Sequence, residues 1–204
     1  MVNPRSITAI IPVHNESKTV ERVAEDLLLI RFLKEIIFID DGSTDSTWKK
    51  LLFFQDKVTL LQNKTNCGKG YSIAQGLKLA STDIVVLLDG DILNYTECDL
   101  KKLIEPVLND TCDFTIKPTD DVWLKFLGGV RCYKRKDLIP LIDKMEKSSK
   151  YGIEVLLNKE FRNKKGIYVK LYDYHHLIKT EKFPLPKAVF EYIKEGLSVI
   201  KQLI

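Results

Sequence analysis

Short apolar segments and longer amphipathic segments alternate along residues 6–117 of this 204-residue chain. The apolar segments are too short for helices, whereas the amphipathic ones place apolar residues at helical spacing. Strands that alternate with helices build βαβ units, so the sequence predicts an α/β fold with a mainly parallel, mixed central sheet flanked by helices. The expected strands are Ser6–Val13, Glu35–Asp40, Val58–Gln62, Ile84–Asp89 and Asp113–Lys117, and the expected helices are Ser17–Leu29, Thr44–Gln55, Lys69–Ala80 and Asp99–Leu108.

The alternation is less regular after Pro118, but it continues, and we expect residues 1–182 to form one domain. Pro184 and Pro186 then interrupt the chain before a last helix. The further expected elements are a strand at Phe126–Arg135, helices at Lys136–Glu146 and Gly152–Arg162, a strand at Gly166–Tyr172 and a C-terminal amphipathic helix at 183–204 that is regular from Lys187.

One face of this C-terminal helix is apolar. The residues of this expected apolar face recur at helical spacing and are Val189, Ile193, Leu197, Ile200 and Ile204. Such a stripe covers the protein's own core or a partner subunit, as in a homodimer. The alternative is peripheral contact with the inner face of a membrane, with Lys187, Lys194 and Lys201 near the lipid headgroups.

Composition narrows the classes of partner and compartment. The net charge of +4 is too small to indicate binding to nucleic acid. The four cysteines have neither CxxC nor zinc-type spacing, which favours free thiols in a reducing cytoplasm. A strand begins close to the N-terminus and no run of about 18 apolar residues follows, so we expect neither a signal peptide nor a membrane-spanning helix.

Four polar clusters follow the expected strands. They are Pro12–Glu16, Asp40–Asp45, Asn66–Gly70 and Asp89–Asp91. In an open α/β sheet, ligands bind outside the carboxyl ends of the strands, so the four clusters should lie around one site.

Asp89-Gly90-Asp91 closes the most apolar strand. Two carboxylates there suit Mg²⁺ or Mn²⁺, which take oxygen ligands and share the phosphates of a bound substrate. The alternative is a simple turn, which Asp and Gly also favour. Downstream, His175 and His176 follow the last expected strand, and strand geometry would send their rings to opposite faces. At most one of them would then reach a cation at Asp91, and His176 is our choice.

Four other residues carry charge or hydrogen-bonding groups that could serve a ligand. Asp40 and Asp41 could accept hydrogen bonds from a nucleoside base or ribose, or they could serve only the strand-to-helix turn. Lys69 stands between two glycines before a helix, where a mobile cation can meet phosphate. Glu154 shares a helix face with Leu157 and is therefore expected either to pair with a cation or to have a raised pKa.

The clusters in this order resemble the motifs of the family 2 glycosyltransferases, which have the GT-A fold. The matching motifs are Ile-Pro-Val-His-Asn-Glu, Asp-Asp-Gly-Ser-Thr-Asp, Asn-x-Gly-Lys-Gly and Asp-Gly-Asp. The later Gly-Gly-Val-Arg and Tyr-Gly-Ile-Glu segments are similar to those of the branch that contains polyprenyl-phosphate sugar transferases and glucosyl-3-phosphoglycerate synthase.

The resemblance implies that residues 1–117 bind a nucleotide sugar and that residues 118–182 bind the acceptor. It implies Mn²⁺ or Mg²⁺ as cofactor. Asp91 would be the principal metal ligand, with His176, or alternatively His175, as a second ligand. Asp89 would contact the ribose or the metal. Asp91 and Glu154 would take part in catalysis. The other implied nucleotide-sugar contacts are Pro12, Val13, Asn15, Glu16, Asp40, Asp41, Ser43, Lys69 and Gly90, and the implied acceptor contacts are Gly128, Gly129 and Arg131.

The expected function is metal-dependent transfer of a sugar from a UDP- or GDP-linked donor to an acceptor hydroxyl or phosphate, such as a polyprenyl phosphate or a small phosphorylated acid. Inversion and retention of the anomeric configuration both remain open. One alternative is a non-catalytic subunit that binds nucleotide sugars. A second is a sugar-phosphate nucleotidyltransferase, but the N-terminal segment lacks the glycine-rich, basic loop that such an enzyme needs.

Overall fold

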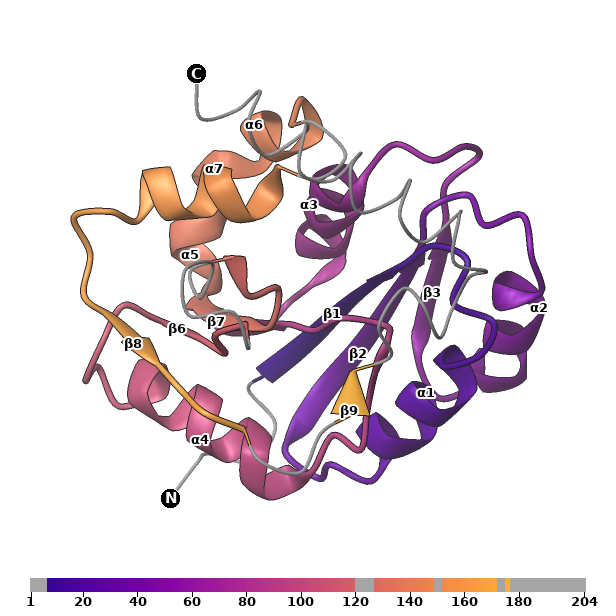
Figure 1. Ribbon diagram of the computed structural model, residues 1–204, viewed down its shortest axis with the longest axis horizontal. Coiled ribbons are helices and arrows are strands. Elements are labelled where there is room, and N and C mark those ends of the chain that lie inside the picture. The colour runs from indigo at the N-terminus through magenta and orange to yellow at the C-terminus, as the bar shows by residue number, and fades with distance from the viewer. Residues whose placement is uncertain (1–6, 120–126, 149–151, 172–174, 177–204) are drawn as a thin grey trace.

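A computed structural model describes residues 7–119, 127–148, 152–171 and 175–176 (Figure 1). Seven strands form one mixed sheet in the order β3-β2-β1-β4-β7-β6-β8. Strand β7 runs antiparallel to β4 and β6, and the other strands are parallel to one another. The strands are β1 (Ile7–Val13), β2 (Leu33–Asp40), β3 (Thr59–Gln62), β4 (Ile84–Leu87), β6 (Phe114–Ile116), β7 (Arg131–Lys134) and β8 (Gly166–Tyr168).

This arrangement confirms the predicted α/β class, the mixed central sheet and the single domain. Strand β7 comes from the predicted acceptor half, yet it lies between β4 and β6 of the nucleotide half. The two predicted halves therefore share one sheet.

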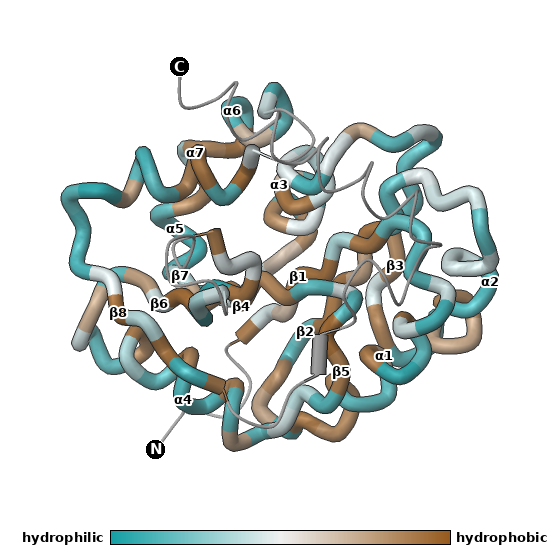
Figure 2. Tube along the Cα trace, in the orientation of Figure 1, coloured by the Kyte–Doolittle hydropathy of each residue, from teal (hydrophilic) through white to brown (hydrophobic). Residues whose placement is uncertain are grey.

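Helices cover both faces of the sheet. Successive side chains of β1 point to opposite faces, so that Ile11 packs in one buried cluster and Ile10 in the other. Both sides are apolar, as expected for parallel strands buried on two faces. Most hydrophilic residues lie on the outer helices and in the loops (Figure 2). The first face carries α1 (Val20–Leu28), α2 (Thr47–Leu51) and α4 (Glu97–Leu108), and the second carries α3 (Lys69–Leu79), α5 (Arg135–Leu138), α6 (Ile142–Glu146) and α7 (Ile153–Glu160).

Three helices differ most from the prediction. Helix α1 begins at Val20, not Ser17, because the carbonyl of Glu16 already accepts the N–H groups of Thr19 and Val20 in a turn. Helix α2 is short and continues as a 3-10 turn at Leu52–Phe54. The expected helix Lys136–Glu146 is divided into α5, a 3-10 turn and α6 around Pro140, which lacks the N–H that a continuous helix requires.

A second, two-stranded sheet was not predicted. Strand β5 (Ile92–Leu93) pairs antiparallel with β9 (His175–His176), so that Ile92 lies opposite His176. The expected C-terminal helix, residues 183–204, lies outside the described residues. Within the described part of the chain, no helix combines the length and apolar character needed to cross a bilayer.

A half-buried carboxylate stabilises the amino edge of the sheet, opposite the expected site. Glu35 accepts hydrogen bonds from Thr8 Oγ1 at 2.5 Å and from the N–H of Ser81 at 3.0 Å. Burial alone would raise the pKa of Glu35, but the bonds from Ser81 and Thr8 outweigh burial and lower it.

We therefore expect Glu35→Gln to lower the free energy of unfolding at pH 7 by about 1–2 kcal/mol. A lowered folded-state pKa stabilises the protein above the ordinary value of 4.5, and this contribution disappears as the pH falls through the folded-state pKa. Urea denaturation at pH 7 and below pH 4 checks this. A difference between variant and wild type that stays constant with pH would contradict it.

Candidate active site

The predicted clusters converge at the carboxyl edge of β1, β2 and β4. The strand order reverses between β1 and β4, which is where open α/β sheets bind ligands. The chain is closely packed there: the N–H of Asp41 donates to the carbonyl of Val13 at 2.8 Å, and a Cβ on Gly90 would collide with the Val13 side chain.

Asp41 holds the loop that leads into α3. Its buried carboxylate accepts the N–H groups of Cys67 at 2.9 Å and Gly68 at 2.8 Å, and the amide of Asn63 at 2.9 Å. Gly68 has a φ of 102°, a conformation that favours glycine, and Lys69 begins the helix directly after it. The Asp41 carboxylate thus fixes the position of Lys69.

Asp40 is fully buried and organises the turn after β2. One carboxylate oxygen accepts the N–H and hydroxyl of Ser43, and the other accepts the amide of Gln62 at 2.8 Å. These contacts agree with the alternative that Asp40 stabilises the strand-to-helix turn. Contact of Asp40 or Asp41 with a nucleotide stays a prediction.

The loop after β1 is tied to the same turn. The N–H of Asn15, at a φ of 57°, donates to Ser43 Oγ at 2.9 Å, and its side-chain oxygen accepts the N–H of Thr44 at 2.8 Å. His14 Nδ1 lies 3.0 Å from the carbonyl oxygen of Asp41 and must be the donor. The Pro12–Glu16 segment therefore has a fixed shape at the edge of the sheet.

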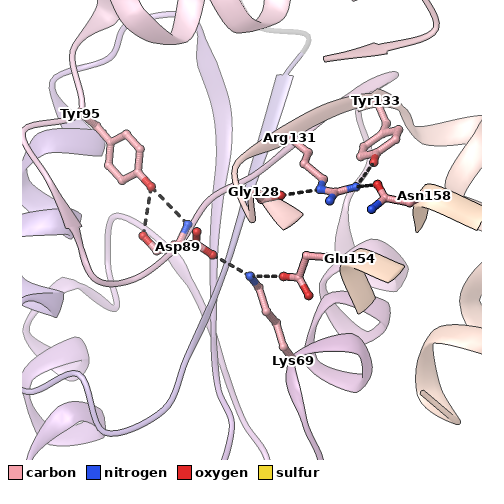
Figure 3. A network of polar contacts seen from close by, with 8 residues as sticks. All are labelled: Lys69, Asp89, Tyr95, Gly128, Arg131, Tyr133, Glu154 and Asn158. Carbon is pink, nitrogen blue, oxygen red and sulfur yellow. Dashed lines mark hydrogen bonds and ion pairs between the residues drawn. The ribbon is translucent and has the colours of Figure 1, made fainter. Parts of the chain in front are cut away.

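Lys69 joins the two halves of the fold (Figure 3). Its Nζ lies 2.7 Å from Asp89 Oδ1, after β4, and 2.7 Å from Glu154 Oε1, in the first turn of α7. The expected cation partner of Glu154 is therefore Lys69. Burial opposes the charged form of Lys69, but the two carboxylates outweigh it and hold the pKa of Lys69 above its usual value. Lys69 is thus a permanent cation near neutral pH and not a proton acceptor.

Gly129 lies directly against this ion-pair cluster. A Cβ on Gly129 would lie 2.5 Å from both carboxylate oxygens of Asp89 and 2.6 Å from Lys69 Nζ. A Cβ on Gly128 would instead collide with the backbone carbonyl of Lys117.

We expect Gly129→Ala to lower kcat at least about 10-fold with little loss of stability, because only movable side-chain ends must yield and small displacements at a reacting centre are costly. Gly128→Ala is the matched control. This substitution should lower the free energy of unfolding by about 1–3 kcal/mol, because its Cβ would collide with the backbone of Lys117. Turnover and urea denaturation of both variants check the contrast, and equal effects on stability would contradict it.

Arg131 is buried between β7 and α7. Its Nε donates to the carbonyl of Gly128 at 2.6 Å, and its Nη1 donates to Asn158 Oδ1 at 2.9 Å (Figure 3). These contacts hold the Gly128–Gly129 segment in place. Acceptor binding by Arg131, as predicted from sequence, stays a prediction.

Asp91 is half-buried and lies between Gly90 and β5. The pairing of β5 with β9 brings the backbone of His175–His176 beside the residues that follow Asp91. Among the described residues, no group of three or more His, Cys, Asp or Glu side chains could hold a metal by itself. The chemistry still suits Mg²⁺ or Mn²⁺, which are bound by one or two carboxylates together with substrate phosphates.

Two residues that shape this site carried no recognisable sequence signal. The Tyr95 hydroxyl accepts the N–H of Asp89 at 3.2 Å and donates to its carbonyl at 3.1 Å. Asn158 supports Arg131 from the middle of α7. Neither stands in a motif, and only their tertiary contacts reveal them.

Comparison with known proteins gives the class of this fold and site. Residues 8–174 match the family described as Glycosyl transferase family 2. The chain therefore belongs to this family, which rules against the nucleotidyltransferase alternative.

Individual relatives are similar over parts of their length. A poly-beta-1,6-N-acetyl-D-glucosamine synthase of Staphylococcus aureus is 34% identical over 43% of this chain and 22% of that protein. The UDP-N-acetylglucosamine–dolichyl-phosphate N-acetylglucosaminyltransferase of Methanococcus voltae is 30% identical over 54% of this chain and 50% of that protein. The chain thus matches half or less of the length of these two relatives.

Among solved structures, glucosyl-3-phosphoglycerate synthase from Mycobacterium tuberculosis, in complex with Mn²⁺, UDP and phosphoglyceric acid, superposes with a TM-score of 0.72 at 21% identity. The match covers 97% of this chain and 78% of that one. It confirms the fold.

Proposed function

We propose that this protein is a glycosyltransferase that moves a sugar from a UDP- or GDP-linked donor to an acceptor hydroxyl or phosphate, with Mn²⁺ or Mg²⁺ as cofactor. The observation that carries the proposal is Lys69, held between Asp89 and Glu154 at the carboxyl edge of the sheet in a family 2 chain. The donor diphosphate would lie at this edge of the sheet, between the loops after β1, β2 and β4.

The chain's own groups account for charge stabilisation. Departure of the nucleoside diphosphate builds negative charge, and a fixed cation aimed at that charge lowers the barrier. Lys69 provides such a cation, because its raised pKa keeps it protonated and Asp41 fixes its loop. Asp91, with His176 or alternatively His175, and with Asp89 nearby, would hold the metal. The metal would add Lewis-acid stabilisation of the same diphosphate.

Glu154 stands on the acceptor side of Lys69. It comes from α7, whereas Lys69 and Asp89 come from α3 and the end of β4. If the reaction inverts the sugar, Glu154 would be the base that takes the proton of the acceptor hydroxyl. Glu154 would then have to break its ion pair with Lys69, or keep that pair while it accepts the proton. Donor binding at Lys69 and the position of Glu154 are therefore linked.

The acceptor is proposed to carry phosphate. The Mycobacterium tuberculosis structure contains phosphoglyceric acid, and the Methanococcus voltae relative is named for dolichyl phosphate. These acceptors share an anionic phosphate group. In this chain, Gly128, Gly129 and Arg131 would line the acceptor subsite next to Lys69.

We also propose a cytoplasmic location, with contact to the inner face of a membrane or to a second subunit through residues 183–204. All four cysteines are free in the structure, which fits a reducing compartment.

Incubation of the purified chain with UDP- and GDP-sugars, with and without Mn²⁺, tests the proposal. Slow, Mn²⁺-dependent release of UDP or GDP supports a transferase. Tight binding of a donor without any turnover, on water, phosphoglyceric acid or a polyprenyl phosphate, would instead establish the non-catalytic binding subunit.

A further inference from the structure

Helix α1 supports the loop that contains Asp91. This loop, residues 89–95, leads from the end of β4 through β5 toward α4. Two buried side chains of α1 and its N-cap, Thr19 and Asp26, make hydrogen bonds to the backbone of the loop.

Thr19 holds the start of the loop. Thr19 is 1% exposed, and its hydroxyl lies 2.8 Å from the carbonyl oxygen of Gly90, nearer than its other acceptors on Glu16. Gly90 has no room for a side chain because it is pressed against Val13 of β1. The residue immediately before Asp91 is therefore clamped from two sides.

Asp26 holds the far end of the loop. Its carboxylate accepts the N–H of Asn94 at 2.8 Å and Arg22 Nε at 3.0 Å. Asn94 has a φ of 64°, a conformation that costs energy for a residue with a side chain and that needs support from its surroundings. Burial raises the pKa of Asp26, and the hydrogen bond from Asn94 and the charge of Arg22 offset this effect only in part.

The spacing of Thr19 and Asp26 along the helix fits the spacing of their contact points on the loop. Thr19 and Asp26 are seven residues apart, which places them on the same face of the helix, about 10 Å apart along its axis. Between their contact points at Gly90 and Asn94 lie Asp91 and strand β5, which pairs with the His175–His176 backbone. Helix α1 thus spans the loop from end to end.

We propose that Thr19 and Asp26 are positioning residues that orient Asp91 for its metal. The inference rests on the proposed function, and it adds a role for α1 that the motifs do not contain. A carboxylate on a loop that is fixed at both ends loses little conformational freedom when it binds a cation. Groups that orient a metal ligand commonly determine how tightly the site binds its metal.

Asp26→Asn and Thr19→Val test this role, because both keep the shape of the side chain. The measurement is the Mn²⁺ affinity of the UDP- or GDP-bound protein, from the electron paramagnetic resonance signal of free Mn²⁺. We expect about 10- to 100-fold weaker Mn²⁺ binding for Asp26→Asn and a smaller loss in the same direction for Thr19→Val. Nucleotide affinity without metal should remain within about twofold of wild type.

Glu35→Gln is the matched control. It removes a similar hydrogen-bonded carboxylate at the opposite edge of the sheet, so it should lower stability and leave Mn²⁺ affinity unchanged. If both α1 variants lower stability but bind Mn²⁺ as wild type does, the positioning role is overturned while the proposed function stands. If wild type binds nucleotide and no Mn²⁺, both the proposed function and this role are overturned.

Discussion

Replacement of Lys69 by methionine should lower kcat by about 100- to 1,000-fold, the usual cost of removing one group that stabilises charge in the transition state. Methionine keeps much of the length of the side chain but removes the positive charge. The Asp89 and Glu154 carboxylates, each 2.7 Å from Nζ, then lose their shared cation and repel each other. Single-turnover measurement of donor consumption at saturating donor isolates this effect from donor binding.

The same variant also loses stability, so a second comparison must separate structure from chemistry. We expect Lys69→Met to lower the free energy of unfolding by about 1–3 kcal/mol. Combining it with Glu154→Gln removes the repulsion and should recover much of that stability. Turnover should stay low, because the double variant lacks both the cation and the proposed base. Recovery of turnover together with stability would show that Lys69 acts only through the fold.

Lys78→Met is the matched control for this experiment. Lys78 lies on the same helix and pairs with Glu146 at 2.6 Å, but far from the carboxyl edge, near the other end of α3. Its replacement should change kcat less than twofold, because exposed ion pairs contribute little. A large loss of turnover in this control would show that any disturbance of α3 is sufficient.

The sheet and the edge that carries the site could be predicted from the sequence because their signals are local. The strand Ile84–Leu87 is continuously apolar, and α3 begins at Lys69 as predicted, directly after Gly68. Parallel strands bring their carboxyl ends to one edge, so the polar clusters had to meet once the strands were identified.

Partners that come from distant segments could not be predicted. The sequence marked Asp41 as a polar residue at a strand end, but it could not show that the donors would be N–H groups of Cys67 and Gly68. The pairing of Ile92 with His176 joins two-residue strands, which are too short to have a recognisable period.

Glu154 shows both what the sequence could predict and what it could not. Its position on the same helix face as Leu157 indicated a carboxylate that either pairs with a cation or has a raised pKa, and the structure shows a cation partner, Lys69. The identity of the partner depended on how α7 packs near the start of α3. Contacts of this kind are set by tertiary packing and leave no pattern in either segment.

Asp91→Asn should lower turnover by more than about 100-fold and weaken Mn²⁺ binding at least as strongly, because an amide is a neutral and poorer ligand for a hard cation. The fold should be retained, since Asp91 is half-buried in a loop that Thr19 and Asp26 hold through backbone groups. The measurement is turnover across a Mn²⁺ titration. If high Mn²⁺ partly restores turnover, the variant has lost affinity for the metal. If high Mn²⁺ leaves turnover unchanged, the metal binds in the wrong position.

Two comparisons make this result specific. Asp83→Asn changes an exposed aspartate at the opposite end of β4 and should leave both turnover and Mn²⁺ affinity unaltered. His176→Ala and His175→Ala should differ, with the larger loss of Mn²⁺ affinity for His176 if that residue is the second protein ligand. If Asp91→Asn keeps wild-type Mn²⁺ dependence, Asp91 does not bind the metal, and the cation must be held by other groups at this edge of the sheet.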